Sequence, residues 1–212
     1  REAEAKIEHL ATHDALTGLP NRVLFNERIR KELTRLRQGE SMAILCLDLD
    51  HFKHVNDTLG HPMGDALLRA TATRLQGCVR ERDTIARLGG DEFAIIQTEQ
   101  EQPRDATALA QRLVDILAAP FNIDGHHIVV GTSVGIALAP SDGADPDQLL
   151  KNADLALYRA KSERGTYHFF EPEMDAKMQT RRRLELDMRA ALGAGQFEVC
   201  YQPSVNLQRN EV

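Results

Sequence analysis

Apolar residues recur along the chain with two different spacings. Helical spacing predicts four helices, over residues 22–37, 65–80, 104–118 and 146–163. Continuous or alternating apolar runs predict strands, over residues 41–52, 85–88, 93–96 and, as one or two strands, 126–140. The Gly-rich segment "LGHPMGD" (residues 59–65) predicts a loop. Because helices and strands alternate, the pattern predicts an α/β domain whose mixed central β-sheet is flanked by helices.

The two ends of the chain have a different character. The first twelve residues are charged and have a thin apolar stripe of Ile7 and Leu10, which predicts a connector helix from an upstream domain. Near the other end, a polar linker is expected to run into an amphipathic helix, and residues 197–203 alternate as a strand does. We therefore expect a fragment in three parts: a connector (1–12), one domain (13–171), and a linker with the truncated start of another domain (172–212).

The composition limits the ligands and the cellular location that can be expected for this chain. The 212 residues carry a net charge of −6, with 5% aromatic residues and no Trp, which argues against binding polymeric nucleic acid. A small anionic ligand would need a local cation or a metal ion. Three scattered cysteines fit a reducing, cytoplasmic location. The longest mostly apolar stretch, 128–140, is too short to span a membrane, so we expect no direct membrane contact from this fragment.

Two acids end the predicted strand at 41–52. Asp48 and Asp50 are two residues apart, so both point to the same face of the strand. Burying two adjacent carboxylates is costly, and a divalent cation would offset both charges. Carboxylates together with water and phosphate oxygens are the ligands that Mg²⁺ prefers. The alternative is that both acids face solvent at the strand end.

A second acidic pair lies at the tip of a predicted hairpin, in "RLGGDEFAII". Gly89 and Gly90 suit a turn and allow a ligand to approach the backbone. If this hairpin lies beside the strand that carries Asp48, then Asp91 and Glu92 converge on the same place. Such a group of carboxylates is typical of metal-assisted phosphoryl and nucleotidyl transfer. The alternative is a solvated hairpin tip.

Polar residues in "KHVNDTLGHPMGD" add candidates for ligand binding. Asn56 and Asp65 could read a base edge, because Asn donates and accepts while Asp accepts. The alternative is a surface loop in which Asp65 caps the next helix. Lys53 and Lys161 are candidates for countering phosphate charge, although an isolated lysine is usually a solvated side chain.

Taken together, these motifs resemble the GGDEF domain, the diguanylate cyclase family, over about residues 10 to 170. The segments that carry the resemblance are "DALTGLPNR" (14–22), "DLDHFKHVND" (48–57), "GHPMGD" (60–65), "RLGGDEF" (87–93), "SVGIA" (133–137) and "ADLALYRAK" (153–161). The resemblance implies a palm-like nucleotide cyclase fold. It also implies that two GTP condense to cyclic di-GMP and two pyrophosphates in an antiparallel homodimer, with Mg²⁺ as cofactor and Mn²⁺ as an alternative ion.

The family's site residues carry over by position in this sequence. Asp48 and Asp91 resemble the metal ligands, assisted by the carbonyl of Leu49. Either Asp91 or Glu92 would help to deprotonate the attacking ribose 3′-hydroxyl. The remaining substrate contacts implied by the resemblance are Asn56 and Asp65 for guanine, with His61 as a substrate-binding candidate in the same loop, and Lys53, Lys161 and the amides near Phe52 for the phosphates. Arg164 also resembles a phosphate contact, but the loop that carries it is one residue shorter than the family pattern.

An upstream pair resembles the family's inhibitory product site. Arg80 and Asp83 form the R-x-x-D pattern, and Arg112 resembles the second arginine of that site, where cyclic di-GMP would bind. The alternative is a surface ion pair. We expect Arg87, just before the glycines of the tip, to be structural and not catalytic.

The C-terminal tail, 181–212, resembles the start of an EAL phosphodiesterase domain, and that family's catalytic residues would lie beyond this chain. No phosphodiesterase activity is therefore expected of the fragment, and an upstream domain could anchor the full-length protein to a membrane. The leading hypothesis is an active diguanylate cyclase. The alternatives are a GTP-binding regulatory module for an attached phosphodiesterase, and a receptor for the product.

Overall fold

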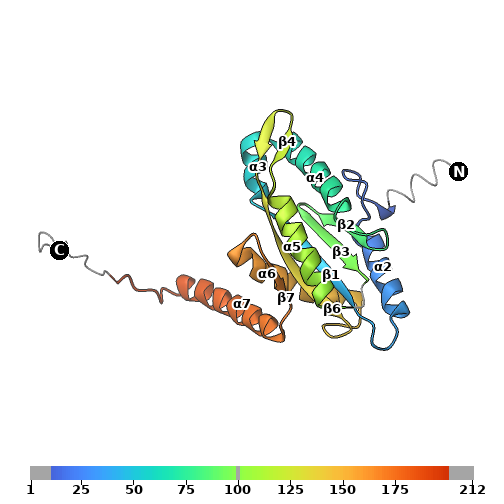
Figure 1. The fold of residues 1–212 in the computed structure, drawn as a ribbon. Coiled ribbons are helices and arrows are strands. Elements are labelled where there is room, and N and C mark those ends of the chain that lie inside the picture. Colours follow the sequence, from blue (N-terminus) through green and yellow to red (C-terminus); the bar gives the residue numbers. More distant parts are fainter. Residues whose placement is uncertain (1–10, 99–100, 201–212) are drawn as a thin grey trace, which may run out of the picture. The chain divides into compact units, whose positions relative to one another are not determined.

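The computed structural model describes residues 11–98 and 101–200 (Figure 1). The chain divides into two compact units, residues 1–175 and 176–212. All the predicted site residues belong to the first unit, which contains a central sheet and its covering helices. Among the described residues, no helix has the length and the apolar character that a membrane crossing needs.

The first unit contains a five-stranded mixed sheet, and a mixed sheet was predicted. The strands lie in the order β2-β3-β1-β6-β7. Its strands are β1 (Met42–Asp50), β2 (Thr84–Gly89), β3 (Glu92–Gln97), β6 (Gly131–Ala139) and β7 (Tyr167–Phe169). The central strand β1 pairs antiparallel with both β3 and β6, whereas β7 joins β6 in parallel. A separate two-stranded ribbon consists of β4 (Phe121–Ile123) and β5 (His126–Ile128). The sequence did not predict β4 or β7.

Helices cover both faces of the sheet (Figure 1). One face carries α3 (Phe52–Leu59), α4 (His61–Gln76) and α5 (Arg104–Ala118), and the other carries α2 (Arg22–Arg35) and α6 (Pro146–Glu163). Leu45 and Leu47 of β1 pack on the first side, whereas Ile44 and Cys46 pack on the second. All nine residues of β1 are buried, which explains why its sequence is apolar until the two acids.

The predicted helices at 104–118 and 146–163 have the observed bounds, and the first helix ends at Arg35 instead of residue 37. The loop predicted at 59–65 is wrong. Only Gly60, with φ of 85°, separates α3 from α4, and α3 itself was not predicted. Pro62 is tolerated in the first turn of α4. Residue 64 lies inside the helix and is glycine, because a Cβ there would overlap the side chain of Asn56.

The predictions for the chain ends have mixed outcomes. Most of the connector helix predicted at 1–12 lies outside the described residues. Its last two residues, 11 and 12, are described and are helical. The polar linker predicted after residue 171 is wrong, because α7 (Pro172–Gly193) is one continuous helix. The strand predicted at 197–203 is also wrong over residues 197–200, where Phe197 and Val199 are exposed and no described strand pairs with them. The rest of that segment lies outside the described residues.

Candidate active site at the end of the central strand

Two acids face each other across neighbouring strands at the end of β1. Asp48 is 9% exposed and lies directly opposite Glu92 of β3. Residues paired across strands share a face, and this face is the one covered by α2 and α6. Like charges directly opposite one another are destabilising, so the pair calls for a counter-charge.

The hairpin lies beside β1, because β3 pairs with it, so the condition set in the sequence analysis is met. Gly89 and Gly90 have φ of 145° and 53°, which a residue with a Cβ rarely adopts, so the sharp turn depends on them. The turn places Asp91 at the edge of the acidic group. Burial raises the pKa of the Asp48 carboxyl, and the negative charges of Asp91 and Glu92 raise that pKa further. The carboxylates of the strand and of the tip are therefore close enough to interact.

A lysine from α6 partly neutralises this group. Nζ of Lys161 lies 2.7 Å from Oδ2 of Asp48. This contact lowers the pKa of Asp48, but burial and the neighbouring acids outweigh it. The site thus retains an excess of negative charge that a further cation would relieve.

Two residues near this group were not found from the sequence. Asp154 of α6 lies near the thiol of Cys46, and desolvation raises the pKa of the Asp154 carboxyl. Arg22, the first residue of α2, places its guanidinium 3.6 Å from Oε2 of Glu92. One signal could have identified Asp154: it lies seven residues before Lys161, which puts both side chains on one face of a helix.

Asp50 has different surroundings from Asp48, although it is only 6% exposed. Its Oδ1 accepts a hydrogen bond from the Ser133 hydroxyl at 2.8 Å, and its Oδ2 accepts one from the Gly165 amide at 3.0 Å. We expected one cation to offset both strand acids. The structure instead satisfies both oxygens of Asp50 with donors from the protein, so Asp50 anchors the loop after α6.

The backbone that follows β1 offers groups for an anionic ligand. The backbone carbonyl of Asp48 accepts a hydrogen bond from the Thr132 hydroxyl of β6 at 2.9 Å. Because carbonyls alternate in direction along a strand, the carbonyl of Leu49 points toward the β3 side. There the pairing of β1 with β3 has ended at Asp48 and Glu92. The amides of Phe52 and Lys53 begin α3 and have no acceptor within the helix. The Lys53 side chain is exposed beside them.

The predicted guanine-reading residues lie on two consecutive helices, not on a loop. Asn56 belongs to α3, and Asp65 lies in the second turn of α4, so Asp65 does not cap that helix. The missing side chain of Gly64 lets Asn56 pack against α4 right beside Asp65. His61 is exposed at the start of α4. The structure therefore places Asn56 against Gly64, the residue that immediately precedes Asp65.

Arg80 and Asp83 form a tight turn next to a pocket of about 400 Å³ that both residues line. The Arg80 amide donates to Oδ2 of Asp83 at 3.0 Å. The third predicted residue, Arg112, does not line this pocket. Its guanidinium donates to the carbonyl of Cys78 at 2.7 Å, which ties α5 to the segment that leads to Arg80.

Arg87 fastens the hairpin tip, in agreement with the structural role expected for it. Its guanidinium donates to both oxygens of Asp14, at 2.9 and 3.0 Å, and to the carbonyl of Gly90, at 2.7 and 3.0 Å. Burial raises the pKa of Asp14, but hydrogen bonds from Thr17 and Arg87 outweigh it, so the net pKa is lowered. Arg87 is thus a partly buried link between the tip and the segment before α2.

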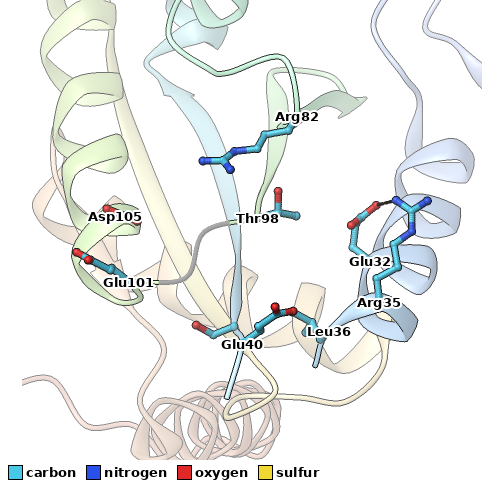
Figure 2. A pocket seen from close by; sticks show the side chains of 9 residues that line it. Glu32, Arg35, Leu36, Glu40, Arg82, Thr98, Glu101 and Asp105 are labelled. Carbon is cyan, nitrogen blue, oxygen red and sulfur yellow. Dashed lines mark hydrogen bonds and ion pairs between the residues drawn. The ribbon is translucent and has the colours of Figure 1, made fainter. Parts of the chain in front are cut away.

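A second hollow, of about 520 Å³, lies at the opposite end of the strands (Figure 2). It is lined by side chains such as Glu32, Arg35 and Arg82 and contains none of the predicted site residues. Within the described part of the chain, no three His, Cys, Asp or Glu side chains lie close enough to hold a metal ion. The residues fit Mg²⁺ in another way, because this ion is commonly held by one or two carboxylates together with substrate phosphates and water.

Comparison with known proteins agrees with this geometry. The family model described as "Diguanylate cyclase, GGDEF domain" matches residues 11–166. The chain is 47% identical to an uncharacterized signaling protein of Caulobacter vibrioides, over 100% of this chain and 27% of that protein. It is 44% identical to the bifunctional diguanylate cyclase/cyclic di-GMP phosphodiesterase MucR of Pseudomonas aeruginosa, over 96% of this chain and 30% of that protein. The chain thus spans less than a third of the length of these relatives.

A solved structure supports the fold. The GGDEF domain of TpbB from Pseudomonas aeruginosa matches with a TM-score of 0.76 and 39% identity, over 79% of this chain and 99% of that one. The predicted palm-like cyclase fold, with its mixed sheet flanked by helices, is thereby confirmed.

Proposed function

The chain belongs to the GGDEF family of diguanylate cyclases, and on that premise we propose that it condenses two GTP to cyclic di-GMP and two pyrophosphates. The observation that carries this proposal is the meeting of Asp48, Asp91 and Glu92 at the ends of two strands, with Lys161 at 2.7 Å from Asp48. This arrangement suits a reaction in which negative charge gathers on transferred phosphate.

The reaction needs two identical bond exchanges. In each, a ribose 3′-oxygen bonds to the α-phosphorus of the other GTP, the bond from that phosphorus to the β-phosphate oxygen breaks, and pyrophosphate leaves. The 3′-hydroxyl proton passes to a carboxylate, for which either Asp91 or Glu92 is placed. Each subunit supplies one such half-site, so we propose that a homodimer completes the reaction.

Asp48, Asp91 and the Leu49 carbonyl would hold Mg²⁺, or Mn²⁺ in its place. When bound, the ion would neutralise phosphate charge and promote attack by the 3′-oxygen. The excess negative charge that raises the pKa of Asp48 supports a cation at this point. Lys161 and Lys53 would bind the phosphates, and the first amides of α3, at Phe52 and Lys53, favour an anion there.

Guanine would bind between α3 and α4. Asn56 can donate to and accept from the base edge, and Asp65 can accept from its N–H groups. The close packing of Asn56 on Gly64 keeps the two polar groups together, and exposed His61 borders them. These contacts would select guanine over adenine, which presents no comparable pair of N–H donors to Asp65.

We further propose that cyclic di-GMP inhibits the enzyme by binding at Arg80, Asp83 and Arg112. The turn formed by the first two residues and the adjoining pocket support this assignment. The segment 172–212 would begin an EAL phosphodiesterase domain, without that domain's catalytic residues, and the protein would act in the cytoplasm.

Incubation of the chain with GTP and Mg²⁺, followed by chromatography, tests the main proposal. We expect cyclic di-GMP and pyrophosphate in a 1:2 ratio, with Mn²⁺ supporting the same reaction and EDTA stopping it. Glu92→Gln serves as a matched variant that keeps the size of the side chain and removes a candidate base. Complete absence of product at concentrations that favour dimers would overturn the proposal.

A second candidate function is a GTP-binding module that regulates an attached phosphodiesterase. The observation in its favour is that the relative MucR is named for both activities and is more than three times the length that matches here. GTP binding without turnover in the full-length protein, accompanied by a GTP-dependent change in hydrolysis of cyclic di-GMP, would favour this function over synthesis.

A further inference from the structure

Two residues with left-handed backbone meet at the edge of the candidate site. Among the described residues, three that are not glycine have positive φ: His51 (64°), Asp124 (47°) and Arg164 (58°). Asp124 lies in the Asp-Gly turn between β4 and β5, where this conformation is common. His51 and Arg164 are 113 residues apart in sequence, and yet NH1 of Arg164 lies 2.9 Å from Nε2 of His51.

The positions of these two residues explain what the contact holds. His51 immediately precedes α3, whose first amides face outward, and Arg164 immediately follows α6. The next residue, Gly165, donates to Asp50 at 3.0 Å. Two consecutive residues of the loop after α6 are therefore fastened to the end of β1.

The contact also fixes two cations relative to each other. Lys161 lies one helical turn before Arg164 and is held at Asp48. Arg164 is held at His51, on the far side of Asp50 in the chain. The left-handed backbone at Arg164 and the contact with His51 together direct this arginine.

We propose that His51 is a positioning residue that holds Arg164 beside the first turn of α3, where the guanidinium binds the terminal phosphates of the nucleoside triphosphate. The inference rests on the proposed function of this site. Nε2 of a neutral histidine accepts one N–H of the guanidinium, which has five. The remaining N–H groups stay available for a two-point contact with phosphate, beside the amides of Phe52 and Lys53.

Substitutions at residue 51 can separate this role from a purely structural one. His51→Gly permits the left-handed backbone and removes the acceptor, whereas His51→Asn tolerates that backbone and keeps an acceptor. If His51 served only the backbone, glycine would be the better replacement. If His51 positions Arg164, asparagine would be the better replacement, because it keeps an acceptor.

The test measures equilibrium binding of a non-hydrolysable GTP analogue and of GMP to the whole 212-residue chain in the presence of Mg²⁺. We expect His51→Gly to weaken analogue binding by about three- to tenfold, as loss of one hydrogen bond to a charged group predicts. Binding of GMP, which lacks the terminal phosphates, should not change. His51→Asn should bind nearly as the wild type does. In turnover, KM for GTP should rise in His51→Gly while kcat stays constant.

A double-mutant cycle provides the second readout. Arg164→Ala changes an exposed side chain and should weaken analogue binding to the same extent, and the combination with His51→Gly should weaken it no further. Wild-type affinity in His51→Gly, an equal loss for GMP, or additive losses in the double variant would each overturn the inference. If the wild-type chain binds neither nucleotide, the proposed function itself fails.

Discussion

Asp48 and Asp50 lie two residues apart on the same strand and the same face, and they are almost equally buried. Their surroundings are opposite. Asp50 receives a hydroxyl and an amide, one at each oxygen. Asp48 faces two further acids, and Lys161 contacts Asp48 itself while the more distant Arg22 lies near Glu92.

The difference teaches that burial and strand position do not tell a structural acid from a functional one, whereas the partners do. A carboxylate whose oxygens both accept from the protein contributes to folding. A carboxylate left among like charges costs stability, and that cost is reasonable where a ligand will later supply the missing positive charge. Four predictions test this contrast.

The largest expected effect is on catalysis. Asp48→Asn should reduce synthesis of cyclic di-GMP by about 10³-fold, equivalent to about 4 kcal/mol in the barrier, because it removes a proposed metal ligand. Its free energy of unfolding, measured with urea, should not fall by more than about 0.5 kcal/mol, since a carboxylate repelled by Asp91 and Glu92 is also removed. A strongly destabilised variant would show that Asp48 is structural and would erase the contrast with Asp50.

The matched substitution at Asp50 should act on stability. Asp50→Asn presents an NH₂ group where the Gly165 amide or the Ser133 hydroxyl now donates, which should cost about 1–3 kcal/mol of unfolding free energy. Urea unfolding of both isosteric variants under identical conditions provides the comparison. Equal stability of the two variants would contradict the assignment of Asp50 as the structural acid.

A partner of Asp50 should show a smaller effect. Ser133→Ala deletes one donor and leaves the Gly165 amide in place, so a loss of about 0.5–1.5 kcal/mol is expected. Since the two residues share one interaction, combining Ser133→Ala with Asp50→Asn should destabilise less than the sum of the single changes. Strict additivity in thermal or urea unfolding would mean that the hydrogen bond contributes nothing.

The smallest expected effect is in the pH dependence of stability without metal, and it compares Asp48 with Asp14. The pKa of Asp14 is lowered from 3.8, so its contribution is present above pH 3.8 and disappears as pH falls toward the lowered value. The pKa of Asp48 is raised from 3.8, so its ionisation removes stability as pH rises from 3.8 through the raised value.

Unfolding of Asp14→Asn and Asp48→Asn, measured in EDTA across the acidic range, should therefore diverge in opposite directions from the wild type as pH rises. The Asp14 variant becomes relatively less stable and the Asp48 variant relatively more stable. Parallel curves for the two variants would show that the charges around Asp48 do not matter to folding.

Much of the fold followed from local pattern. The apolar run of β1 and the spacing in α5 and α6 were sufficient to place those elements, because each is buried along its whole length or along one regular face. The helix α3 was missed, and α4 was predicted at 65–80, four residues too late, where Gly64 and Pro62 suggested a loop. The reason for Gly64 lies in a neighbouring helix, and no local rule contains it.

The sequence also predicted part of the candidate site. The sequence identified Asp48 and the hairpin acids as candidates, since strand periodicity and the turn are local features, but their meeting depends on the pairing of β1 with β3. It did not separate Asp50 from Asp48, because Ser133 and Gly165 are more than eighty residues away. Arg22 was missed for the same reason, because it comes close to Glu92 only after folding.

The contact between Gly64 and Asn56 has a consequence for how sequences of this kind can diverge. A Cβ at residue 64 would overlap the Asn56 amide that is proposed to read guanine, so a larger residue at position 64 would displace that amide. A substitution at residue 64 should therefore be accompanied by a change at residue 56. The proposed guanine preference of the site therefore depends on residues 56 and 64 together.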